Sequence, residues 1–145
     1  MERDIEEAGQ SLTPAECITL CQRRGLREIA FTYNEPTTWI EYNLEICRLA
    51  KDAGIKTVYV SNGFMSDYAR EQLAQYITGI NIDLKSFSEK TYRQIIGGGL
   101  EQVKSNIQYF FEHGVVTEVT TLVVPQMNDS TEELTQMAEF LASVS

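Results

Sequence analysis

Hydrophobic and polar positions along the chain follow one pattern that repeats four times. An amphipathic stretch of helical period ends in a glycine, the residue that most readily adopts the left-handed conformation at a helix C-terminus. These glycines are Gly25, Gly54, Gly79 and Gly114. Each is followed by a short run rich in β-forming residues, at positions 28–33, 57–61, 80–84 and 115–124. Because the glycines are spaced like βα units, the pattern predicts strands that alternate with helices.

The helical stretches also carry start signals. Capping-box pairs, in which a Ser or Thr precedes a Glu by three positions, occur at Thr13/Glu16, Thr38/Glu41 and Ser130/Glu133. Pro14 follows the first cap, at the position where a helix best tolerates proline. A shorter helix is expected within residues 88–96, ended by the glycine run 97–99. In the second helix, apolar residues from Trp39 to Ala53 share one face.

Alternating strands and helices indicate an α/β protein with a parallel sheet and right-handed crossovers. An open nucleotide-binding sheet and a (β/α) barrel both fit this alternation. The turn after Tyr33 lacks the glycine fingerprint of the former, and polar residues follow every strand, as at the active rim of a barrel. We therefore predict a partial, TIM-like (β/α) barrel of about four parallel βα units. A closed barrel takes about 250 residues, so we interpret residues 1–145 as the central part of a barrel domain, incomplete at both ends.

Composition narrows the class of protein. Apolar residues make up 43% of the 145 positions, which is typical of a folded domain and excludes wholesale disorder. The formal net charge of −9 argues against nucleic-acid binding, which depends on basic surfaces. No apolar run is long enough to span a membrane, and the charged start Met1–Asp4 does not resemble a signal peptide. Three irregularly spaced cysteines suit a reducing compartment, so we expect a cytoplasmic protein.

Polar side chains at the strand ends are the candidates for binding chemistry. In chain order they include Asn34 and Glu35, Ser61 and Asn62, Asp83 and Lys85, and Gln126, Asn128 and Asp129. Asp83 and Lys85 lie two positions apart, so on a regular strand they face the same side and can pair or hold a zwitterion together. With Glu35, they offer both signs of charge around one rim, as a polar small molecule requires. For Ser61, Asn62 and Asn128, a purely structural role in turns and caps is an equally good interpretation.

The cysteines and the histidine are weak candidates for chemistry. Cys17 and Cys21 have the spacing of the first half of a CxxxCxxC motif, but the third position is Arg24. We interpret both, and Cys47, as small core residues on helices. His113 precedes Gly114 at a helix C-terminus, where an imidazole interacts favourably with the helix dipole. The sequence therefore predicts no metal ligand in this chain.

Four stretches at these strand ends are similar to one family. They are 29–37 (IAFTYNEPT), 60–64 (VSNGF), 81–85 (NIDLK) and 118–125 followed by Asn128-Asp129-Ser130. In order and spacing they resemble the glycyl-radical-activating branch of the radical S-adenosylmethionine (SAM) superfamily. The nearest resemblance is to pyruvate formate-lyase activating-enzyme homologues, in particular the AmmeMemoRadiSam-system subgroup, and it extends over residues 12–143.

The resemblance implies a partial barrel in which a 4Fe–4S cluster, held by three cysteines, binds SAM. Reductive cleavage of SAM then produces a 5′-deoxyadenosyl radical that removes a hydrogen atom from a target. The residues that the resemblance places at SAM are Asn34, Glu35, Ser61, Asn62, Asp83, Leu84 and Lys85. Among these, Asn34 and Glu35 match the motif that binds the amino group of SAM. The resemblance assigns no catalytic residue to this chain.

The sequence departs from the family pattern at several points. Val60 replaces an acidic residue that some activating enzymes carry, and Gln126 follows Pro125 where a glycine is common. No CxxxCxxC motif occurs in the chain, and the family places it just upstream of the matching region. The sequence therefore predicts that the chain is a fragment of a radical SAM enzyme and is inactive by itself.

Two readings of the function remain open at this point. The chain is either the middle of a radical SAM oxidoreductase or a remnant without a cluster that binds a ligand or a protein. Both share every motif described above, and neither the radical target nor the oligomeric state follows from the sequence. An incomplete barrel would leave two sheet edges and an apolar concave face uncovered, so we also expect self-association through those surfaces.

Overall fold

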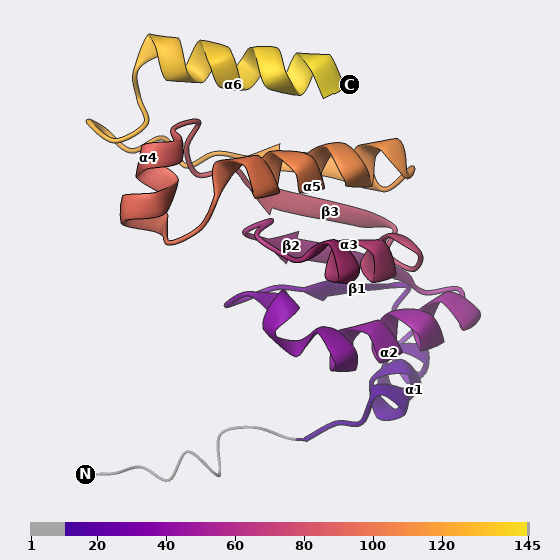
Figure 1. The fold of residues 1–145 in the computed structure, drawn as a ribbon. Coiled ribbons are helices and arrows are strands. Elements are labelled where there is room, and N and C mark those ends of the chain that lie inside the picture. The colour runs from indigo at the N-terminus through magenta and orange to yellow at the C-terminus, as the bar shows by residue number, and fades with distance from the viewer. Residues whose placement is uncertain (1–10, 145) are drawn as a thin grey trace, which may run out of the picture.

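A computed structural model describes residues 11–144 of the chain as helices packed on one parallel sheet (Figure 1). The strands are β1 Glu28–Phe31, β2 Lys56–Ser61, β3 Gly79–Asp83 and β4 Val116–Thr120. The helices are α1 Pro14–Arg23, α2 Ile40–Asp52, α3 Asp67–Ala74, α4 Glu89–Thr91, α5 Leu100–Glu112 and α6 Thr131–Val144. A 3₁₀ turn, η2, covers Pro36–Trp39, and a π-helical turn, η3, covers Tyr92–Ile96. The segment Met1–Asp4 lies outside the described residues.

The four strands form a single sheet in the order β1-β2-β3-β4, and every neighbouring pair is parallel. Phe31 pairs with Tyr59, Ser61 with Ile82, and Asp83 with Thr120, so the carboxyl ends of the strands lie along one edge. This order confirms the predicted α/β class and the open, partial barrel. The fourth strand is shorter than the predicted run, because it ends at Thr120, opposite the end of β3.

Side chains along each strand alternate between two faces of the sheet. Tyr59 and Ile82 are completely buried, in one core with Ile46 of α2 and Ile107 of α5. Neighbouring positions on the strands point to the opposite face and line a shallow hollow there, from Glu28, Lys56, Val58, Asn81, Val116 and Glu118. Charged and apolar side chains share this hollow, and self-association through the open face of the sheet stays a prediction.

Two of the three predicted capping boxes differ from the structure. The first is confirmed, since the backbone N–H of Thr13 donates to the Glu16 carboxylate at 2.8 Å and Glu16 N–H donates back to Thr13 Oγ1 at 3.3 Å. The second does not form, because η2 occupies that segment and the Thr38 hydroxyl donates to the carbonyl of Glu35 at 2.7 Å. Trp39, which ends η2, is 70% exposed, so the predicted apolar face of the second helix begins beyond it.

The third capping box is only half formed. Glu133 N–H donates to Ser130 Oγ at 3.2 Å, but the Glu133 carboxylate reaches instead to the β3–α4 loop. There it accepts hydrogen bonds from Ser86 Oγ at 2.5 Å and from Phe87 N–H at 2.6 Å. Tertiary contacts thus replace the local cap and fasten α6 to the loop that follows β3.

The predicted short helix is present as α4 followed by η3, and Gly97 ends it with a φ of +82°. Within residues 11–144, no helix combines the length and the hydropathy that crossing a bilayer would demand.

Candidate functional site

A pocket of about 240 Å³ opens at the carboxyl ends of β1, β2 and β3, and we call it the rim pocket. Its lining residues are Tyr33, Asn34, Glu35, Val60, Ser61, Asn62, Asp83 and Lys85. The structure therefore brings together all the residues singled out by the resemblance except Leu84. Sequence reasoning had missed Tyr33 as a lining residue, although it directly precedes Asn34.

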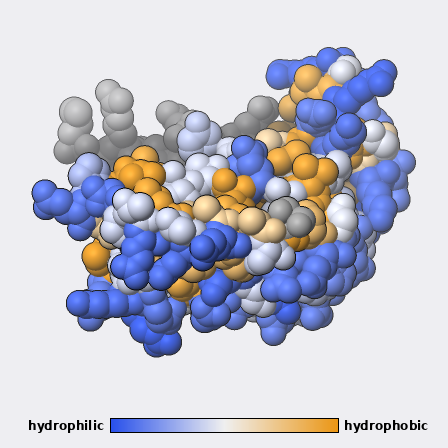
Figure 2. Space-filling model, turned by 90° about the horizontal axis from the view of Figure 1, so that it is seen from above, coloured by the Kyte–Doolittle hydropathy of each residue, from blue (hydrophilic) through white to orange (hydrophobic). Residues whose placement is uncertain are grey.

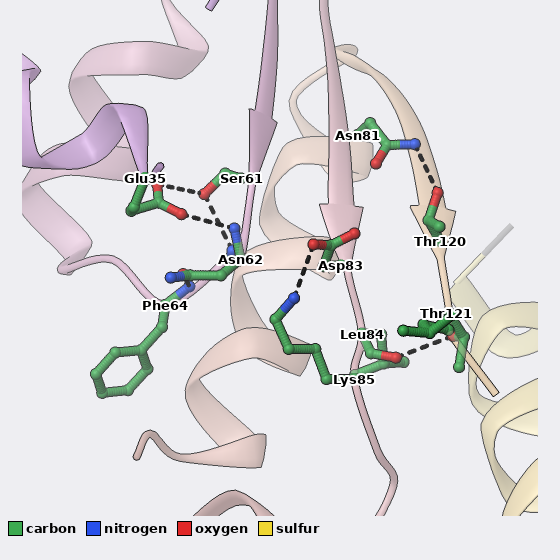
Figure 3. A network of polar contacts seen from close by, with 12 residues as sticks. Glu35, Ser61, Asn62, Phe64, Asn81, Asp83, Leu84, Lys85, Thr120 and Thr121 are labelled. Carbon is green, nitrogen blue, oxygen red and sulfur yellow. Dashed lines mark hydrogen bonds and ion pairs between the residues drawn. The ribbon is translucent and has the colours of Figure 1, made fainter. Parts of the chain in front are cut away.

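Glu35 joins the ends of β1 and β2 (Figure 3). One carboxylate oxygen accepts from Ser61 Oγ at 2.8 Å and from the hydroxyl and N–H of Thr37 at 2.5 and 3.1 Å. The other accepts from the backbone N–H of Asn62 at 2.7 Å. A carboxylate has about four acceptor sites, so these bonds leave Glu35 little capacity for a ligand. Its role in this geometry is to hold two strand ends in place.

The backbone at Tyr33, two positions before Glu35, is strained. Tyr33 and Asn34 have φ values of +57° and +52°, in the left-handed region that L-residues other than Asn and Asp rarely adopt. Tyr33 is also 93% exposed, so burial of its ring does not compensate for the strain. Strain of this kind persists when the surroundings over-determine the conformation, and it is typical of functional sites. The bonds of Glu35 to the next strand provide that constraint.

The turn after β2 packs against the core on one side and lines the rim pocket on the other. Gly63 has a φ of +72°, and a Cβ there would lie 2.6 Å from Ile82 Cγ2, so only glycine fits. Its N–H donates to Ser61 Oγ at 3.0 Å, and Phe64 N–H donates to Asn62 Oδ1 at 2.8 Å. The side chains of Ser61 and Asn62 therefore serve the turn as well as lining the pocket.

Asp83 and Lys85 supply the charges of the rim pocket. Lys85 Nζ lies 2.8 Å from Asp83 Oδ2, and about 40% of each side chain is exposed. The pair comes from the last residue of β3 and the loop after it, and both side chains face the pocket as the two-residue spacing predicted (Figure 3). An opened pair of this kind can offer a carboxylate to an ammonium group and an ammonium to a carboxylate.

The side chain of Leu84 lies on the opposite side of this strand end and does not line the rim pocket, so its place at the ligand stays a prediction. Its side chain is fully buried in the core. Its N–H donates to the carbonyl of Thr120 at 2.9 Å, and its own carbonyl accepts from Thr121 Oγ1 at 2.9 Å. Because strand side chains alternate, the residue between Asp83 and Lys85 has to point away from the pocket.

Two distant side chains hold the backbone of Lys85. Lys85 N–H donates to the hydroxyl of Tyr92 at 3.1 Å, and the Lys85 carbonyl accepts from Asn128 Nδ2 at 2.7 Å. Asn128 is completely buried, while Gln126 and Asp129 of the same loop are exposed and bond to each other at 3.0 Å. Of Gln126, Asn128 and Asp129, it is therefore Asn128 that bonds to a residue lining the rim pocket.

The cysteines do not fit an iron–sulfur cluster. Cys21 and Cys47 are buried on α1 and α2, and Cys17 contacts the hydroxyl of Tyr42 at 3.4 Å. Burial raises the pKa of the Cys47 thiol to about 11, which opposes the thiolate form that ligates iron. Residues 11–144 contain no group of three or more His, Cys, Asp or Glu side chains able to hold a metal ion. His113 caps α5, with its Nδ1 2.8 Å from the carbonyl of Tyr109.

Comparison with curated sequences identifies a distant relative. The uncharacterized protein MJ0808 of Methanocaldococcus jannaschii is 27% identical over 132 residues, an alignment that covers 91% of this chain and 39% of that protein. The chain therefore spans well under half the length of this relative.

Solved structures share the fold over most of the chain. A domain of pyruvate-formate lyase-activating enzyme from Bacteroides vulgatus has a TM-score of 0.70 at 20% identity, covering 79% of this chain and 71% of that one. SuiB of Streptococcus suis, in its complex with S-adenosylmethionine, has a TM-score of 0.73 at 17% identity, covering 95% of this chain and 33% of SuiB. The sequence model of the Radical SAM superfamily matches residues 3–141. Because this match takes in nearly every residue described above, the chain belongs to the radical SAM superfamily.

Proposed function

We propose that the rim pocket binds the amino-acid end of SAM, and that the chain is the SAM-binding part of a glycyl-radical-activating type of radical SAM enzyme. The observation that carries the proposal is the Asp83–Lys85 pair, which faces a pocket at the strand ends beside the Glu35-braced turn. The methionine end of SAM is a zwitterion beside a positive sulfonium. It therefore suits a pocket that contains both signs of charge.

The chemistry of the lining residues assigns them separate roles. Asp83 accepts from the α-ammonium group, and Lys85 donates to the α-carboxylate. Glu35 acts as a positioning residue, because its oxygens are already bonded to Thr37, Ser61 and Asn62. SAM supplies the precursor of the deoxyadenosyl radical, and the chain's own residues bind and orient it. The described cysteines do not fit the cluster, so no step of cleavage is assigned to this chain.

The activating-enzyme type is the finer part of the proposal. Its structural support is the similarity to the Bacteroides vulgatus domain, of which the chain covers more than two thirds. Its support in the sequence is the set of strand-end stretches around Asn34, Asn62 and Asp83. The hydrogen donor that such an enzyme would act on is a protein or a small molecule.

The positions of the cysteines support a second candidate function. The three cysteines lie on α1 and α2, buried or half-buried, and none faces the rim pocket. A chain of this kind that works without a cluster would bind its ligand or a protein without redox chemistry. This binding module would use the same pocket, so the two functions separate only in whether electron transfer follows binding.

Calorimetry with the purified chain tests SAM binding. We expect Asp83→Asn and Lys85→Met each to weaken SAM binding roughly tenfold, because each removes one charged partner of the zwitterion. Glu118→Gln is the matched control, since it neutralises an exposed carboxylate on the same face of the sheet, outside the rim pocket. Equal binding by all variants, or no binding of SAM at millimolar concentration, would contradict the proposal.

A further inference from the structure

A second, smaller compartment adjoins the rim pocket. Its volume is about 110 Å³, and its lining residues are Asn62, Phe64, Lys85, Tyr92, Ile96, Gly97 and Gly98. Asn62 and Lys85 belong to both spaces, so the compartment opens beside the Asp83–Lys85 pair. It lies between the turn after β2 and the loop in which η3 ends. The stretches that resemble the family include residues 60–64 of this turn but none of residues 92–98.

Phe64, Ile96, Gly97 and Gly98 form the apolar part of the compartment wall. Phe64 is 48% exposed, and its backbone is fixed by the bond from its N–H to Asn62 Oδ1. Gly98 lies against the ring, where a Cβ would come within 3.5 Å of it. A cavity of about 150 Å³ is known to hold benzene, so this space suits an apolar group of about three or four carbon atoms.

The polar atoms at its mouth are hydrogen-bond donors. Lys85 Nζ donates one hydrogen bond to Asp83, and its ammonium group has two further N–H donors. Asn62 Oδ1 is occupied by Phe64 N–H, whereas its Nδ2 has no acceptor among residues 11–144. Tyr92 is 2% exposed; its oxygen accepts from Lys85 N–H, and its own proton has no acceptor among the described residues. A ligand that satisfies these donors has to present acceptor oxygens.

We infer that this compartment binds a small acyl group, that is, a carboxylate or amide oxygen attached to a short aliphatic chain. The oxygen lies against Lys85, Asn62 and Tyr92, and the carbon chain lies between Phe64 and Gly98. Its use as the place where the radical target lies beside SAM rests on the proposed function. Binding of the acyl group itself does not.

Titration of the labelled chain with three probes that share an isopropyl group tests the charge preference. In ¹H–¹⁵N spectra, sodium isobutyrate and isobutyramide should shift the amides of 62–64 and 96–98 saturably, whereas isobutylamine should not. Sodium acetate should bind roughly tenfold more weakly than isobutyrate, because it lacks two apolar carbons. Saturable binding of the amine at these amides as tight as that of isobutyrate would overturn the inference, and so would the absence of any saturable shift with isobutyrate.

Two variants test the location. Gly98→Val, at a position without a positive φ, should weaken isobutyrate binding at least fivefold by filling the space beside Phe64. Tyr92→Phe should weaken it roughly five- to tenfold by removing one donor to a charged acceptor. Ile95→Ala is the control, because Ile95 is 67% exposed on the same turn and does not line the compartment. Unchanged affinity in both test variants would overturn the assignment.

SAM binding is measured on the same samples by calorimetry, so the two proposals fail separately. If SAM binds and isobutyrate does not, the acyl compartment is wrong and the proposed function stands. If isobutyrate binds and SAM does not, the compartment stands and its use beside SAM is wrong.

Discussion

The side-chain amide of Asn128 donates to the backbone carbonyl of Lys85 at 2.7 Å, across 43 positions of sequence. The same amide donates to Leu122 O at 2.9 Å, and its oxygen accepts from Val124 N–H at 2.6 Å. One fully buried residue thus folds the β4–α6 loop and ties that loop to the charged edge of the rim pocket.

Replacement of Asn128 should therefore be costly. We expect Asn128→Ala to lower the free energy of unfolding by about 2 to 3 kcal/mol, because buried backbone groups lose their partners. Asn81→Ala is the matched control, since Asn81 is half-buried and makes one side-chain bond, to Thr120 Oγ1 at 2.9 Å. Urea denaturation of both variants measures the difference. An equal loss of unfolding free energy in both variants would contradict the prediction that the Asn128 bonds stabilise the fold more than the Asn81 bond does.

Gln126 should tolerate glycine unusually well. Its φ is +65°, and its side chain is exposed. An L-residue in this region is strained by about 1 kcal/mol or more, so Gln126→Gly should leave thermal stability unchanged or raise it slightly. Gln108→Gly, in the middle of α5, should instead lower stability by about 1 kcal/mol. A larger loss at Gln126 than at Gln108 would contradict the strained geometry.

The raised pKa of the Cys47 thiol predicts that the free energy of unfolding declines at alkaline pH. Burial raises the pKa of its thiol from 9.0 to about 11, so the unfolded chain releases this proton before the folded chain does. The contribution of the neutral thiol is fully present below pH 9 and is lost as pH rises to about 11, by an amount of up to about 2 to 3 kcal/mol.

Urea denaturation at several pH values measures this dependence. Cys47→Ala should reduce the decline between pH 9 and 10. Burial and neighbouring groups also raise the pKa values of Tyr42, Tyr59 and Tyr92, so a part of the decline should remain in this variant. An unchanged slope in this variant would assign the effect to other groups.

The isolated chain should not assemble a cluster. Anaerobic reconstitution with iron and sulfide, followed by visible absorption spectroscopy, is expected to show no stoichiometric 4Fe–4S species, because the cysteines of α1 and α2 form no group able to hold a metal ion within residues 11–144. A Cys17→Ser/Cys21→Ser/Cys47→Ser variant is the baseline for loosely bound iron. A stable cluster present in the wild type and lost in that variant would show that the helices rearrange.

Self-association through the open sheet is a further expectation. Val116 lies on the edge strand β4 and is 71% exposed, and the outer edge of β1 has no partner among residues 11–144. Figure 2 shows apolar residues interspersed with polar ones over the face it presents. Sedimentation velocity should reveal concentration-dependent association that Val116→Lys weakens several-fold. Ile95→Lys, which adds the same charge at an exposed site on η3, should not weaken it.

The sequence by itself determined the elements and their order. Strand runs, glycine stops and the Thr13–Glu16 cap are local features, because backbone conformation and nearby side chains decide them. Parallel order follows from the length of the crossovers. The two-residue spacing of Asp83 and Lys85 was also sufficient to place them on one face, because side chains alternate along any strand.

Tertiary structure alone decided how the site is held together. Glu133 has a local cap within reach, yet its carboxylate bonds to Ser86 and Phe87, 47 and 46 positions away. Glu35 braces the next strand, and Asn128 is buried against Lys85. Pattern and propensity describe only neighbours in sequence, whereas these partners meet only after the strands have paired and the loops have packed. Only the packed fold therefore decides which polar side chains remain free to bind a ligand and which form hydrogen bonds that hold the site together.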